Sequence, residues 1–88
     1  MSSIKVKVHE IRLDIISYKA KIQGIKEFDF IPVEENPQLG DEIKFIEYDP
    51  VTGRDTGEYR YGKINYVGNN DKIKDGYMIA SSVLLAKQ

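Results

Sequence analysis

The sequence contains no cysteine and only one histidine, His9. Without cysteine, neither a disulfide nor a thiolate metal site can support the fold, and one histidine cannot assemble a metal site by itself. The lack of cysteine suits a reducing compartment, so we expect a cytoplasmic protein. No stretch has the length and hydrophobicity of a secretory signal or a membrane span. We therefore expect no membrane partner, and no motif indicates a cofactor.

The 88 residues of the chain suffice for one modest hydrophobic core, which predicts a single domain over residues 1–88. Alternating apolar and polar residues predict five strands, at 4–10, 25–32, 42–48, 58–67 and 77–85. The polar run at 68–76 is expected to form a connecting loop. This inventory favours an α+β fold that is mainly β, in which about five strands curl into a pseudo-barrel with one short helix.

The helix is predicted between Asp14 and Gly24. The carboxylate of Asp14 is placed to cap the first free amides, and Gly24 is a suitable left-handed stop. The apolar residues of this stretch fall near helical spacing, at Ile15, Ile16, Ala20 and Ile22. Because the helix is short, we expect packing on the sheet to stabilise it.

The segment EYDPVTGRDTG at 47–57 predicts a β-hairpin. Pro50 favours the second position of a turn, and Gly53 and Gly57 accept positive φ angles without steric cost. In the strand that follows, the alternation changes parity near Gly62, which predicts a β-bulge there.

Several short motifs occur in a fixed order along the chain: His9-Glu10-Ile11-Arg12, then Gly24, Lys26, Phe28 and Asp29, then Gly40-Asp41, the hairpin at 47–57, and Lys74-Asp75-Gly76-Tyr77. In this order and spacing the chain resembles the small ASCH domains of the PUA-like superfamily, in a compact group common in bacteria and phages. The resemblance spans nearly the whole chain. It implies a pseudo-barrel with a ligand cleft between the helix and the sheet. Ile31 and Glu35 depart from the family, because relatives carry arginine at both positions.

The resemblance implies that the cleft binds RNA or a nucleotide-like ligand. Lys26 is the best single candidate for a contact, because it matches the lysine of the family and follows the helix-ending Gly24. His9, Glu10 and Asp29 are expected to line the same cleft. Phosphate contacts are predicted for Arg12, Lys19, Lys21 and Lys26, and base stacking for Tyr18, Tyr48, Tyr61 or Tyr77. With two arginines lost, we expect weak affinity for plain RNA.

Hydrolysis is a third-ranked alternative. Some ASCH proteins are amidohydrolases that act on a modified cytidine with a lysine, a threonine three residues later and a distant glutamate. Here Asp29 occupies the threonine position, and a carboxylate does not replace a hydroxyl nucleophile. We therefore expect Lys26 and Asp29 to form an ion pair rather than a catalytic pair. His9 and Glu10 are neighbours on a strand, so their side chains should point to opposite faces.

The charges are segregated along the chain. Residues 1–26 hold six Lys or Arg against two acids, residues 27–58 hold two against ten, and residues 59–88 hold five against two. This pattern predicts a positive surface opposite an acidic lobe. It also supports the second-ranked alternative, an acidic module, as from a phage or mobile element, that binds a basic nucleic-acid-binding host protein. The acids in question are Glu34, Glu35, Asp41, Glu42, Glu47, Asp49, Asp55 and Glu58.

Overall fold

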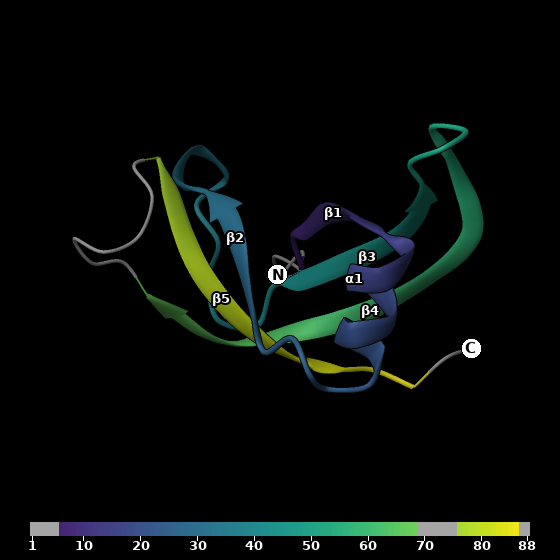
Figure 1. Cartoon of the computed structure of the whole chain (residues 1–88). Coiled ribbons are helices and arrows are strands. Elements are labelled where there is room, and N and C mark those ends of the chain that lie inside the picture. The colour runs from purple at the N-terminus through teal and green to yellow at the C-terminus, as the bar shows by residue number, and fades with distance from the viewer. Residues whose placement is uncertain (1–5, 69–75, 87–88) are drawn as a thin grey trace.

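The computed structural model describes residues 6–68 and 76–86. Within these residues, five strands form one sheet in the order β1-β3-β4-β5-β2, and the sheet curls into a half-barrel (Figure 1). One α-helix, α1, lies inside the curve, against β1 and β3. The predicted α+β, mainly β fold is therefore confirmed. The elements are β1 (Val8–Asp14), α1 (Ile15–Ile22), β2 (Phe28–Pro32), the 3-10 turn η1 (Val33–Glu35), β3 (Glu42–Asp49), β4 (Arg54–Gly68) and β5 (Tyr77–Leu84).

The first strand lies later in the sequence than predicted. It begins at Val8 and continues to Asp14, where it pairs in parallel with Tyr48 of β3. Residues 6 and 7 are not in a strand, and residues 1–5 lie outside the described residues. The strand covers residues 8–14, because these are the residues that pair with β3. The other three pairings in the sheet are antiparallel.

Helix α1 has the predicted ends. Asp14 is the N-cap, and its carboxylate accepts a hydrogen bond of 2.8 Å from the amide of Ser17. Gly24 follows the helix with φ at +81°, a left-handed conformation that glycine adopts readily. The expectation of an isoleucine face was partly wrong, because Ile16 is 83% exposed. The helix instead buries Tyr18 and Lys21, which are three residues apart and therefore share a face.

The hairpin between β3 and β4 is confirmed, with positive φ at Gly53 and Gly57. A bulge in β4 is present, but it lies at Asn65 rather than at the predicted position near Gly62. Gly62 pairs regularly on both sides, and the register shifts occur instead around Glu47 of β3 and Asn65 of β4. Gly62 is required for a different reason: a Cβ there would stand 2.8 Å from Ser82 Oγ and 3.1 Å from the ring of Phe45. The buried positions of β4 are Gly62 and Ile64, whereas Tyr59 is 49% exposed, so the change of parity in the sequence reflects tyrosines that face away from the core.

The core lies between α1 and the concave face of the sheet. Phe45 is its largest fully buried side chain and is surrounded by residues from α1 and from four strands. On β2 the alternation directs Asp29 and Ile31 inward, and leaves Phe28 and Phe30 exposed on the other face. The buried cluster consists of Tyr18, Ile31, Ile43, Phe45, Ile64 and Ala80.

Candidate functional site

Three charged side chains meet where the end of α1 approaches β2. Lys21 comes from the last turn of α1, Lys26 from the connection, and Asp29 from β2. The Lys21 Nζ donates to Asp29 Oδ2 over 2.6 Å, and the Lys26 Nζ donates to Asp29 Oδ1 over 2.8 Å. Both carboxylate oxygens of Asp29 are therefore engaged by ammonium groups. The predicted ion pair of Lys26 and Asp29 is present, and Lys21 completes it as a triad.

The members of this triad differ in exposure. The side chains of Asp29 and Lys21 are only 1% and 3% exposed, whereas that of Lys26 is 33% exposed. Lys21 is held further by the carbonyl oxygen of Glu27, and its Nζ lies 4.9 Å from the centre of the Phe45 ring. Lys26 also donates to the carbonyl oxygen of Phe28 over 2.8 Å. Lys21 is thus a structural cation, and Lys26 is the member of the triad that solvent reaches.

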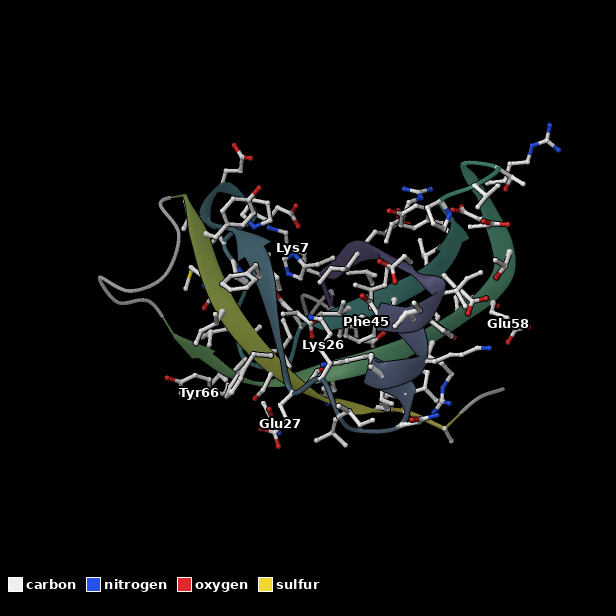
Figure 2. The ribbon with its side chains drawn as sticks, viewed as in Figure 1. Lys7, Lys26, Glu27, Phe45, Glu58 and Tyr66 are labelled. Carbon is white, nitrogen blue, oxygen red and sulfur yellow. The ribbon has the colours of Figure 1, made fainter. Side chains whose placement is uncertain are left out.

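An open pocket of about 480 Å³ adjoins the triad. This volume lies in the range of small-molecule sites. In the view of Figure 2, Lys26 lies between α1 and β2, and Glu27 lies at the outer edge. Strand β5 contributes part of the lining, and its Ser81 lies beside Phe28 because the two residues pair across the β2–β5 ladder. The lining consists of Lys21, Gly24, Lys26, Glu27, Phe28, Ser81, Ser82 and Leu84.

Arg12 does not line this pocket. Its guanidinium binds both oxygens of Asp55 at the hairpin, with the Arg12 Nε 3.0 Å from Asp55 Oδ1. These hydrogen bonds hold the pKa of Asp55 below its usual value and raise the pKa of Arg12 above its own. The structure therefore separates Arg12 from Lys26, although the sequence grouped both as phosphate contacts.

His9 is buried, but in a different place from Lys26. Its Nδ1 lies 2.9 Å from Glu35 Oε1, and its Nε2 lies 2.9 Å from Asp41 Oδ2. Burial raises the pKa of Asp41, but the hydrogen bonds from His9 and from the Gln38 amide outweigh it, so the pKa is below its usual value. This His9 cluster joins β1 to η1 and to the start of β3.

Glu10 points away from His9, as the strand alternation predicts. His9 is buried and Glu10 is exposed. The two side chains are therefore not arranged as an acid and base pair. Neither residue lines the pocket beside Lys26.

Tyr18 is part of the core and presents no free ring face to a base. Burial raises the pKa of its hydroxyl, and the nearby charge of Glu58 adds to the effect. Another candidate for stacking, Tyr61, lines a second pocket of about 410 Å³ that shares no residue with the first. There its ring lies edge-on to Tyr59, with centroids 5.9 Å apart. Of the residues that the structure describes, Phe28 is the only aromatic one that lines the pocket beside Lys26.

Phe28 and the lining residues from β5 were not predicted from the sequence as parts of the pocket. The signal for Phe28 was present, because an aromatic residue two positions after Lys26 begins the strand. No local signal indicated Ser81 and Ser82, since only the pairing of β2 with β5 brings them to the pocket.

The ionic contacts also change the expected distribution of charge. All five ion pairs among the described residues join the basic block 1–26 to the acidic block 27–58. This happens because β1 lies beside β3 and because α1 leads directly into β2. The opposed positive and acidic surfaces predicted from the sequence are therefore partly neutralised by pairing. No group of three His, Cys, Asp or Glu in the described ranges is arranged to hold a metal ion.

Residues 8–81 match a family described as a domain of unknown function, DUF3850. The match covers most of the chain, and it includes every strand except the last three residues of β5. The chain belongs to this family. No match was found among curated proteins. Within residues 6–68 and 76–86, no helix is long and apolar enough to cross a membrane.

Proposed function

We propose that the pocket beside Lys26 binds RNA or a nucleotide-like ligand, and that the chain is an ASCH-type domain of the PUA-like superfamily. One observation carries the proposal: a partly exposed ammonium group, fixed by Asp29, opens onto a pocket of about 480 Å³. A fixed charge donates a strong hydrogen bond with little loss of side-chain entropy. We also infer a cytoplasmic location, which the lack of cysteine supports.

The two alternatives have less support. The acidic module would use eight acidic side chains, and three of them already have basic partners within the chain. Glu35 and Asp41 contact His9, and Asp55 is bound by Arg12. Hydrolysis would need a nucleophile at position 29, and both oxygens of Asp29 accept hydrogen bonds from lysine. We therefore expect no release of acetate from acetylated cytidine, because a carboxylate at position 29 does not replace a hydroxyl nucleophile.

Fluorescence polarisation with short, labelled single-stranded RNA tests the proposal. Titrations at about 50 and about 200 mM salt measure how strongly phosphate contacts contribute. Lys26→Ala is expected to weaken binding about tenfold or more, the effect of losing a hydrogen bond from a charged donor. Lys19→Ala is the matched control, because Lys19 is an exposed lysine of α1 that does not line the pocket.

Binding unchanged by Lys19→Ala but lost in Lys26→Ala supports the pocket. An equal loss in the two variants indicates diffuse attraction to a positive surface. That result, or no binding at the lower salt concentration, contradicts the proposal. Arg12→Ala should behave like the control, because Arg12 is bound to Asp55 outside the pocket.

A further inference from the structure

The charges around the pocket nearly cancel. Lys21 and Lys26 contribute two formal positive charges, and Asp29 between them contributes one negative charge. Glu27, which is exposed at the edge of the pocket, adds a second carboxylate. Asp29 does not itself line the pocket, but with it the four formal charges sum to zero, so little positive charge is left to balance a phosphate.

The hydrogen-bonding capacity is equally limited. Lys21 is 3% exposed, and its ammonium is taken up by Asp29, the Glu27 carbonyl and the Phe45 ring. Lys26 uses two of its three protons on Asp29 and on the Phe28 carbonyl. One proton of Lys26 is left for a ligand. Phosphate sites in proteins usually offer several converging donors, such as backbone amides or arginine.

The remainder of the lining suits a flat, uncharged ring. Phe28 is 47% exposed, and Leu84 adds a second apolar side chain from β5. Gly24 presents no side chain, and nothing lies within 4 Å of the position that its Cβ would take. Ser81 and Ser82 line the pocket from β5. The Ser81 hydroxyl donates to Asn65 Oδ1 over 2.6 Å, so its oxygen is left to accept, and Ser82 Oγ is a buried atom without a hydrogen-bond partner among the described residues. Base edges carry both donors and acceptors, which an ammonium and hydroxyls can match.

We propose that the pocket recognises an uncharged nucleobase, with Lys26 as the charged donor and Phe28 as the apolar contact, and that it does not hold a phosphate. This inference rests on the proposed function and refines it. The base can belong to a free nucleoside or to a nucleotide of an RNA strand. In either case the energy of binding comes from the base, so a nucleoside without phosphate is sufficient.

Isothermal titration calorimetry with the intact chain tests this inference. The probes are the four common ribonucleosides, their 5′-monophosphates, inorganic phosphate and a short single-stranded RNA. We expect at least one nucleoside to bind within about threefold of its monophosphate, and its affinity to stay the same between about 50 and about 200 mM salt. Inorganic phosphate should neither bind nor compete.

Two variants on one strand supply the residue-level test. Phe28→Ala is expected to weaken nucleoside binding by about 5- to 150-fold, the range for losing one base–aromatic contact. Phe30→Ala is the matched control, because Phe30 is exposed on the same face of β2, two residues further on, and does not line the pocket. A similar effect of both variants contradicts a base in this pocket.

The outcomes separate the inference from the proposed function. Nucleoside binding that is insensitive to salt and sensitive to Phe28→Ala supports both. If RNA or monophosphates bind through Lys26 while nucleosides do not, or if inorganic phosphate competes, the nucleobase inference is overturned and the proposed function stands. If neither RNA nor any of the smaller probes binds, both are overturned.

Discussion

Replacing Asp29 by asparagine removes the one negative charge that two lysines share. The substitution keeps the size of the side chain and one oxygen acceptor, so its effect reports the charge rather than a cavity. Lys26 can then turn into solvent, since it is already 33% exposed. Lys21 cannot, because it is 3% exposed and lies against Phe45. The variant therefore leaves an ammonium group buried without a counterion.

The magnitude follows from this geometry. At 2.6 Å, and with an effective dielectric constant of about 20, Coulomb's law gives an attraction of about 6 kcal/mol between Lys21 and Asp29. Desolvation of both groups offsets a large part of this attraction in the native protein. Breaking a buried pair from one side costs about 3–5 kcal/mol, and we expect a loss of this size for Asp29→Asn. Small domains have only about 5–15 kcal/mol of total stability, so the loss is severe.

Urea denaturation followed by circular dichroism measures the change in the free energy of unfolding. The double variant Lys21→Met with Asp29→Asn removes both buried charges and should recover most of the loss. Lys26→Met alone leaves Asp29 paired with Lys21, and should cost less than about 1 kcal/mol. The reasoning is refuted if Asp29→Asn costs less than about 1 kcal/mol, or if the double variant is no more stable than Asp29→Asn.

Three further substitutions are expected to act through single contacts. The pKa of Asp41 is depressed in the folded protein, so its stabilising effect is present above the unfolded pKa of about 3.9 and is lost as the pH falls through the lower folded value. Asp41→Asn should therefore flatten the acid limb of a curve of stability against pH. An unchanged acid limb would count against the His9 cluster. Gly62→Ala should cost about 1–3 kcal/mol in urea because its Cβ crowds Phe45, and no loss would argue against that close approach. Asp14→Ala should cost about 1 kcal/mol by removing the cap of α1, and an unchanged urea midpoint would show that the cap contributes nothing.

Features set by neighbouring residues were predictable from the sequence. The cap at Asp14, the left-handed Gly24 and the hairpin glycines are local requirements of the backbone, and each is present as expected. The pairing of Lys26 with Asp29 was predicted correctly too, because the two residues are three positions apart at the start of a strand. The opposite orientations of His9 and Glu10 follow from the period of a strand alone.

Features set by the order of strands were not predictable in this way. Gly62 resembled a bulge because the sequence shows a change of parity but not the Phe45 ring that approaches it. Tyr18 looked available for stacking because no local pattern states which face of a short helix meets the sheet. Arg12 and Lys26 looked like one cationic surface until the pairing of β1 with β3 placed Arg12 beside Asp55.

The pocket itself is intermediate between these cases. Its lysine, its glycine and its aromatic residue lie within five positions of one another, at 24–28, and form one half of the site. The other half comes from β5, more than fifty positions later, through the antiparallel ladder with β2. Long-range pairing of this kind depends on the whole fold, so residue spacing does not reveal it.

Amide chemical shifts measured during titration with a ribonucleoside locate the ligand most directly. With ¹⁵N-labelled chain, we expect the largest changes at Gly24, Lys26 and Phe28 on one wall and at Ser81 and Ser82 on the other, with little change at the second pocket around Tyr59. The same titration of Lys26→Ala should move these signals much less. Shifts that centre on the second pocket, or that are the same in Lys26→Ala, would contradict a ligand site built on Lys26.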